Sequence, residues 1–126
     1  MARVLGVGGI FFISPDPGAL AAWYARWLGV EVAGDFTGVI FRPEQVPPGG
    51  YTLWSPFPAD TRYLDPSGLP FMINLMVDDL DGALAQVAEG GATLTGTPES
   101  SEFGRFGWFL DPDGNKIELW QPPRPD

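Results

Sequence analysis

The chain has no histidine and no cysteine among its 126 residues. Without cysteine it can form neither a disulfide nor a reactive thiolate. Without histidine it lacks the side chain that most often binds catalytic transition metals and carries protons near neutral pH. A metal site would have to use carboxylates, amides, hydroxyls and carbonyls, which suit magnesium, calcium or manganese better than zinc, nickel or iron.

Basic residues are few and scattered. Seven Lys and Arg stand against sixteen Asp and Glu, which gives a formal net charge of −9. With no basic stripe, we expect no binding to nucleic acid or to an anionic membrane surface. The acidic balance is compatible with a cationic ligand. No apolar run reaches the ~20 residues that span a bilayer, and the N-terminus lacks signal-peptide features, so we expect a cytoplasmic protein.

Aromatic residues, in contrast, are abundant. The five Trp, nine Phe and three Tyr exceed what a small core requires, so we expect some of these rings to line a cavity or an interface. The fourteen Pro and seventeen Gly punctuate apolar runs and therefore indicate turns. The length fits one compact domain.

The first half of the chain predicts one strand, one helix and three further strands. Asp16 is a good N-cap, Pro17 suits the first helical position, and Gly29 ends the helix. Asp35 and the Pro- and Gly-rich run at 47–50 supply turns. The predicted strands lie at 3–14, 30–33, 37–42 and 51–55, and a connecting loop follows at 56–69.

The second half repeats this order. Asp78 or Asp79 caps a helix that ends at Gly90-Gly91. The sequence Asp111-Pro112-Asp113-Gly114-Asn115 is a strong turn. The predicted strands lie at 71–77, 92–94, 105–110 and 116–121.

Four segments, spread over both halves of the chain, carry motifs that resemble those of a known protein family. The segments are Gly9-Ile10-Phe11-Phe12 through Asp16, Leu20 to Tyr24 with Leu28-Gly29, Asn74 to Leu80, and Phe106 to Trp120. Together they resemble the glyoxalase, bleomycin-resistance and extradiol dioxygenase superfamily, also called vicinal oxygen chelate proteins. The resemblance implies one α+β domain over 1–126, in which two βαβββ modules (about 1–57 and 70–123) form an incomplete eight-stranded barrel around a cup. It also implies a homodimer, since edge strands need covering.

The resemblance further implies metal-ligand positions on inward-facing strand residues. These positions fall on Gly9, about Met72, and Glu118. Only Glu118 has a side chain able to bind a metal, and one carboxylate makes a poor site. We therefore expect no metal and no cofactor.

Two polar residues are candidates for the cup. Glu118 alternates with Ile117 and Leu119, so it points into the cup if those two face the helices. It could act as a general base or anchor a ligand, or it could be a carboxylate paired to a nearby Arg or a relic of a metal site. Asn74 shares a strand face with Met72, and its amide could orient a ligand or make a structural hydrogen bond.

Several aromatic rings are candidate walls of the cup, and for each the alternative is plain packing in the core or a dimer interface. These candidates are Phe11, Trp54, Phe57, Trp108 and Trp120. By their spacing, Trp23, Tyr24 and Trp27 belong to the apolar stripe of the first helix.

These observations leave three functional hypotheses. The leading one is metal-independent binding of a small organic molecule, including drug sequestration as in the bleomycin-resistance branch. The alternative is a lyase or isomerase in which Glu118 abstracts a proton beside a carbonyl while Asn74 or a backbone N–H holds the oxyanion. The third is a structural or regulatory module whose cup is filled by its own side chains.

Overall fold

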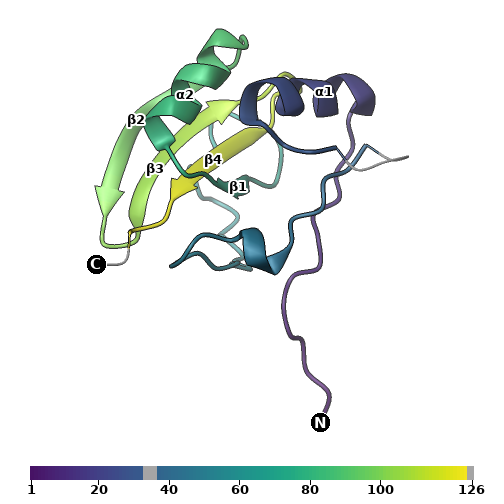
Figure 1. The fold of residues 1–126 in the computed structure, drawn as a ribbon, viewed down its shortest axis with the longest axis vertical. Helices are drawn as coiled ribbons and strands as arrows, with labels where there is room; N and C mark the ends of the chain where they lie inside the picture. Colours follow the sequence, from purple (N-terminus) through teal and green to yellow (C-terminus); the bar gives the residue numbers. More distant parts are fainter. Residues whose placement is uncertain (33–36, 125–126) are drawn as a thin grey trace.

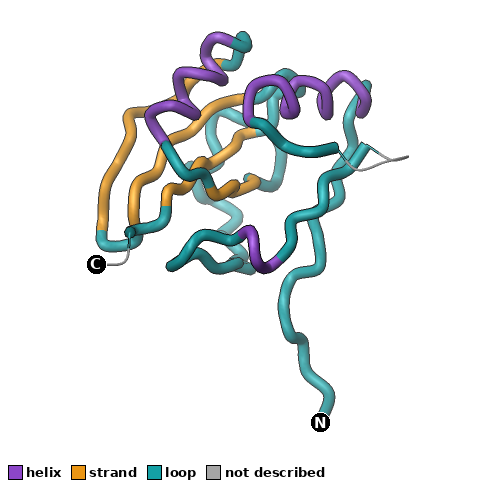
Figure 2. Tube along the Cα trace, in the orientation of Figure 1, coloured by secondary structure: helices purple, strands orange, loops and turns teal. Residues whose placement is uncertain are grey.

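The computed structural model describes residues 1–32 and 37–124. A four-stranded sheet carries two helices on one side (Figures 1 and 2). The predicted α+β class is confirmed, and the sheet is curled and open, consistent with an incomplete barrel. The elements in chain order are α1 (Pro17–Leu28), the short 3-10 helix η1 (Pro43–Gln45), β1 (Ile73–Met76), α2 (Leu80–Glu89), β2 (Thr93–Ser101), β3 (Gly104–Leu110) and β4 (Lys116–Gln121).

Both helices begin and end where the sequence predicts. The Asp16 carboxylate accepts a hydrogen bond from the Ala19 N–H at 3.1 Å, and Gly29 ends α1 in the left-handed conformation with φ 67°. Of the two candidate caps for α2, Asp79 is the one used, and it accepts from the Gly82 N–H at 3.1 Å. Neither helix within the described ranges is long and apolar enough to cross a bilayer.

The sheet has the strand order β1-β4-β3-β2. β1 runs parallel to β4, and the other two pairs are antiparallel. Register places Ile73, Ile117 and Phe109 side by side on the helix-covered face. These residues pack with Leu119 and with apolar side chains of α2 to form the buried core, which is the main source of stability for a domain of this size.

Helix α1 is hydrogen-bonded to the second half of the chain through aromatic residues of its apolar stripe. The Trp23 indole N–H donates to the Gly90 carbonyl at 2.8 Å, and the Tyr24 hydroxyl donates to the Asp111 carboxylate at 2.8 Å. Trp23 and Tyr24 also pack against the core, as the spacing predicts. The other Asp111 oxygen accepts from the backbone N–H groups of Asp113 and Asn115, at 3.0 and 2.9 Å. This network forms the predicted turn between β3 and β4.

Strand β2 is longer than predicted. It reaches Ser101, because β3 provides a partner along its whole length, with one irregularity in register between Thr95 and Glu99. Gly96, at φ 66°, sits at that irregularity. Local propensity gave no sign of this extension, since Gly96 and Pro98 both weaken strand patterns.

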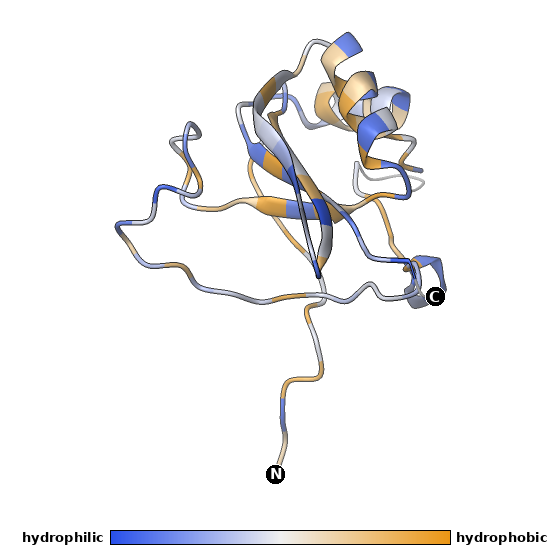
Figure 3. Cartoon of the chain, turned by 90° about the vertical axis from the view of Figure 1, so that its left-hand side faces the viewer, coloured by the Kyte–Doolittle hydropathy of each residue, from blue (hydrophilic) through white to orange (hydrophobic). Residues whose placement is uncertain are grey.

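The strands predicted in the first half are wrong for the described residues. Segments 3–14, 37–42 and 51–55 form no strand, and an isolated bridge joins Val32 to Val39. The predicted turn residue Asp35 and part of the predicted strand at 30–33 lie outside the described residues. A strand needs a partner, and the N-terminal segment instead extends away from the body (Figures 1 and 3). Its apolar side chains are therefore exposed, for example Phe11 at 96% and Ile13 at 95%.

Candidate ligand-binding site

The candidate site lies on the sheet face that points away from the helices, which we call the cup face. Register aligns Asn74 of β1, Glu118 of β4, Trp108 of β3 and Thr95 of β2 in one row across the four strands. Alternation along β4 places Lys116 and Glu118 on this face and Ile117 on the other. The row brings together polar and aromatic groups that lie far apart in the sequence.

Glu118 is the centre of a dense hydrogen-bond network. The residue is 8% exposed. Its Oε1 accepts from the Asn74 amide at 2.7 Å, and its Oε2 accepts from the Trp108 indole N–H at 2.8 Å and from the Tyr63 hydroxyl. Three neutral donors therefore satisfy the carboxylate in place of a cation, as a buried charge requires.

Tyr63 belongs to the predicted loop at 56–69, which folds over the cup face. Burial and the hydrogen bond to Glu118 raise the pKa of its phenol well above the usual range, so the hydroxyl stays protonated and donates. The ring meets that of Trp108 nearly edge-on, with centroids 6.3 Å apart and an interplanar angle of 86°. The loop is thus anchored to the sheet by one tyrosine.

Lys116 is the buried cation of the site. The residue is 8% exposed, and its ammonium donates to the Tyr63 carbonyl. Nζ lies 5.0 Å from the centroid of the Tyr63 ring and 5.9 Å from that of Trp108, within the range of cation–π attraction. Burial lowers the pKa of Lys116, and the nearby Glu118 carboxylate partly offsets that effect.

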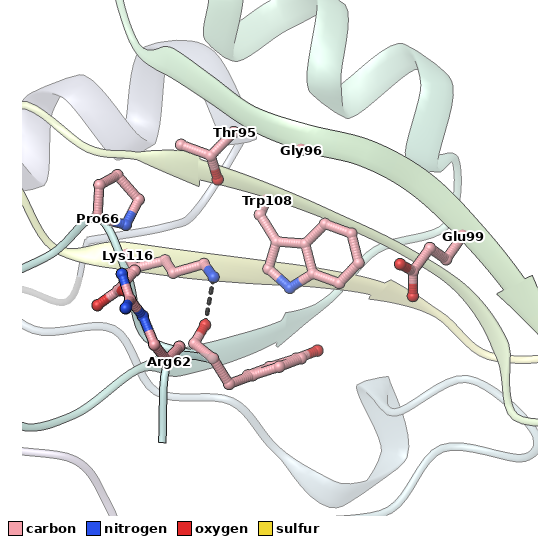
Figure 4. A pocket seen from close by; sticks show the side chains of 9 residues that line it. Arg62, Pro66, Thr95, Gly96, Glu99, Trp108 and Lys116 are labelled. Atoms are coloured by element: carbon pink, nitrogen blue, oxygen red, sulfur yellow. Dashed lines mark hydrogen bonds and ion pairs between the residues drawn. The ribbon is translucent and has the colours of Figure 1, made fainter. Parts of the chain in front are cut away.

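An open pocket of about 420 Å³ lies between the 62–66 stretch of the loop and strands β2, β3 and β4 (Figure 4). Arg62 and Asp65 at its edge form an exposed ion pair at 2.9 Å. The lining residues are Arg62, Tyr63, Asp65, Pro66, Thr95, Gly96, Glu99, Trp108 and Lys116. The volume is in the range of small-molecule sites.

The structure brings only part of the predicted site residues together. Trp108 lines the pocket, and Asn74 and Glu118 lie beside it in the network. The Phe57 ring contacts the Tyr63 ring, with centroids 5.6 Å apart, but Phe57 does not line the pocket. The alternative in which Glu118 pairs with a nearby Arg does not fit its contacts within the described residues, because its hydrogen-bond partners are neutral donors.

The other three predicted wall residues lie elsewhere. Phe11 and Trp54 are 96% and 80% exposed and do not line the pocket. The Trp120 indole N–H donates to the Phe103 carbonyl at 2.6 Å, and its ring stacks on Phe106. Trp120 does not line the pocket, and its contacts are those of packing.

Of the nine residues that line the pocket, only Trp108 was predicted from the sequence, and three of the missed residues matter most for the site, namely Lys116, Thr95 and Tyr63. Lys116 and Thr95 could have been found, because alternation puts Lys116 on the face of Glu118 and strand pairing puts Thr95 opposite Trp108. Tyr63 carries no such signal. Its contact with Glu118 joins two positions that are 55 residues apart in the sequence.

The divalent metal that the resemblance implies does not fit this network. Both Glu118 oxygens face N–H and O–H donors, and an amide nitrogen and an indole N–H cannot bind a cation. Gly9 has no side chain to offer. Across residues 1–32 and 37–124, no three carboxylates gather into a cation site.

Comparison with known proteins identifies relatives of the same architecture. A member of the glyoxalase/bleomycin resistance protein/dioxygenase superfamily from Sphaerobacter thermophilus is 32% identical over 96% of this chain and 98% of its own, with a TM-score of 0.55. TnmS3, an antibiotic-binding protein from Streptomyces sp. CB03234, is 24% identical over 88% of this chain and 89% of its own, with a TM-score of 0.52. The oxidase ChaP-H2 is 24% identical over 87% of each chain, with a TM-score of 0.55.

No curated protein matches the chain significantly. The family model described as glyoxalase-like domain matches residues 9–120, which is most of the chain. Together with the relative from Sphaerobacter thermophilus, this match confirms the resemblance inferred from the sequence motifs. The chain belongs to the glyoxalase-like domain family.

Proposed function

We propose that this protein binds a small organic molecule in the pocket between the 62–66 stretch and the cup face, without a transition metal. The observation that carries the proposal is the pocket itself, which combines an aromatic floor, Trp108, with the ammonium of Lys116. Ligand sites typically pair apolar and aromatic walls with a few polar groups that fix orientation. The pocket is open, so a ligand can enter without displacing the loop.

The hydrogen bonds around Glu118 favour binding without turnover, such as drug sequestration. A general base needs an oxygen within hydrogen-bond reach of the substrate proton. Both Glu118 oxygens are engaged by protein donors, and Tyr63 covers Oε2. The alternative lyase or isomerase mechanism would require Tyr63 to leave before Glu118 could act. Asn74, the candidate oxyanion donor of that mechanism, already uses one of its two amide N–H groups on Glu118.

The test is a fragment screen by ligand-observed NMR, followed by indole N–H spectra of the protein. The chain has five Trp, and each Trp→Phe variant assigns one indole signal. We expect hits to shift the Trp108 signal and to leave that of Trp27 on α1 unchanged. A screen without hits, or hits that shift only other indoles, would contradict the proposal.

We also propose that the chain forms a homodimer and that the N-terminal segment of the first module, about 1–57, packs against a second copy. Support comes from the exposed apolar residues of the N-terminal segment and from β1, which is an edge strand with one partner. Exposed contiguous apolar segments mark interaction surfaces, and edge strands invite pairing. Light scattering coupled to size exclusion tests this, and a monomer at micromolar concentration would contradict it.

A further inference from the structure

We infer that the pocket selects an aromatic carboxylate, with its acid group at the ammonium of Lys116 and its ring against Trp108. This inference rests on the proposed small-molecule binding and names the ligand class. The overall charge of −9 pointed to a cationic guest. The groups that line the pocket favour an anionic ligand instead.

Lys116 is a buried ammonium without an ion pair. An ammonium has three N–H donors, and one of them is used by the Tyr63 carbonyl. Within the described residues Lys116 forms no ion pair with a carboxylate, and the nearby Glu118 is already engaged by three other donors. A buried charge is costly unless it is paired. A carboxylate entering the pocket would supply the missing partner.

Thr95 adds a second polar group at the same place. Its Oγ1 is buried and has no hydrogen-bond partner within the described part of the chain. In Figure 4 the Thr95 oxygen lies on the pocket side, toward Lys116 and Trp108. Buried hydroxyls are usually satisfied, so an orphaned one at the edge of a pocket indicates a group that a ligand completes once the Thr95 side chain turns toward it. The hydroxyl can donate to the second carboxylate oxygen.

Trp108 and Tyr63 define a slot for a flat ring. Trp108 is 7% exposed, and its indole forms the floor. The Tyr63 ring stands almost perpendicular to it, at 86°, and forms a wall. Aromatic ligands gain from offset-stacked and edge-to-face contacts with such surfaces.

The remaining charges set the direction of the ligand. Arg62 is already paired with Asp65 in the exposed pair at the rim, so it offers less attraction than Lys116. Glu99 lies at the far end of Trp108 from Lys116 (Figure 4). A carboxylate is repelled from that end. At the other end the carboxylates near Lys116 are Glu118 and Asp65; the first already accepts three hydrogen bonds and the second is paired with Arg62, so the acid group points to Lys116. We expect Glu99→Gln to strengthen binding of the aromatic acid.

The test uses three probes that share one ring system and differ in charge: naphthoate, naphthalenemethanol and naphthylmethylammonium. Isothermal titration with the full chain should give naphthoate an affinity about tenfold above that of the alcohol, equivalent to about 1.4 kcal/mol. The ammonium probe should bind most weakly. Equal affinities for the three probes would overturn the inference while leaving the proposed binding function intact.

Substitutions identify the residue that causes the preference for naphthoate. Lys116→Met should remove the preference for naphthoate over the alcohol, and Lys116→Arg should keep most of it. Arg26→Met, on α1 far from the pocket, is the matched control for loss of one positive charge and should change nothing. If Lys116→Met binds naphthoate as well as the parent does, the inference is wrong.

Thr95→Val keeps the size of the side chain and removes the hydroxyl. We expect it to raise the unfolding midpoint, because a buried unsatisfied group is lost, and to weaken naphthoate by about threefold. A purely structural Thr95 would change stability without changing affinity. If the parent protein binds none of the three probes and the fragment screen gives no hits, the proposed function fails, and this inference fails with it.

Discussion

At the scale of single residues, Glu118 shows how a charge can be buried without a cation. Asn74, Trp108 and Tyr63 each give it one hydrogen bond, and those donors come from β1, β3 and the 56–69 loop. The carboxylate therefore holds three separate parts of the chain together. A residue that the family pattern marks as a metal ligand is used here as a structural acceptor.

Glu118→Gln should destabilise the fold. Glutamine replaces one acceptor oxygen with an N–H₂ group, which would face a donor, so at least one hydrogen bond is lost. We expect a loss of about 1–3 kcal/mol in the free energy of unfolding. Urea denaturation measures it, with Glu102→Gln, an exposed position, as the control. Equal stability of the two variants would mean that the network contributes little.

Tyr24 and Tyr63 make stability sensitive to high pH. Burial and Asp111 raise the pKa of Tyr24, and burial and Glu118 raise that of Tyr63, each above the ordinary value of 10.0. Above that pH the unfolded chain loses the two protons while the folded chain keeps them. Stability is therefore full below pH 10.0 and falls as the pH rises. Lys116, whose pKa is lowered, acts with the opposite sign, but only below its ordinary value of 10.5.

Tyr24→Phe should therefore flatten the alkaline loss of stability. Well above pH 10.5, the ordinary pKa of Lys116, that lysine has lost its proton in the unfolded chain as well and contributes little. There the buried Tyr24 contributes a slope that approaches about 1.4 kcal/mol per pH unit. Tyr63, which is 41% exposed, contributes less because solvent screens its interactions. The variant should lose one such contribution, at the cost near neutral pH of about 1 kcal/mol for the missing bond to Asp111. Urea denaturation at several pH values measures both effects. An unchanged alkaline slope in the variant would refute this assignment.

At the scale of elements, the sequence correctly predicted the helix boundaries and the turn, because these features depend on residues that are close together in the chain. Asp16, Pro17 and Gly29 bound α1, and Asp79 caps α2, because caps satisfy backbone groups within one turn of the chain. The turn at 111–115 is equally local. The first-half strands could not be judged this way, since alternation tells which segments suit a strand and says nothing about whether a partner is present.

The residues of the candidate site also fall into those that the sequence could predict and those that it could not. Asn74 and Glu118 were found because strand periodicity sets the face on which a side chain lies, and Trp108 was included only as one of several aromatic rings. Trp120 shares that face with Glu118 yet packs on Phe106, since its position along the strand decides its neighbours. Tyr63 was missed because a loop has no periodicity, and its contact with Glu118 depends on the whole fold.

The hairpin between β2 and β3 depends on Gly104. Its φ is +114°, and a Cβ there would lie 2.2 Å from the Gln121 carbonyl oxygen. Gly104→Ala therefore combines backbone strain with a collision against backbone, and we expect a loss of about 3 kcal/mol or more. Gly68→Ala, where a Cβ would meet nothing within 4 Å, is the control and should be nearly neutral. Thermal unfolding compares them, and a tolerated Gly104→Ala would contradict the geometry.

At the scale of the whole molecule, apolar surface is unevenly shared between the two halves. The second half buries its apolar residues between the helices and the sheet, whereas the N-terminal segment leaves Leu5, Phe11 and Ile13 between 87% and 96% exposed. Single exposed apolar residues are ordinary, but a run of them in a strand-like segment is not. Ordering such a segment requires a surface that buries it, and the proposed second copy provides one.

The double variant Phe11→Ser, Ile13→Ser tests that arrangement. If the segment pairs with a second copy, losing two large apolar side chains from the interface should cost about 2–4 kcal/mol of association free energy and raise the dimer dissociation constant at least tenfold. Analytical ultracentrifugation measures that constant. Met1→Ser is the control, because it also removes an exposed apolar side chain but lies outside the predicted strand at 3–14. If the double variant dimerises as the parent does, the N-terminal segment is not the interface.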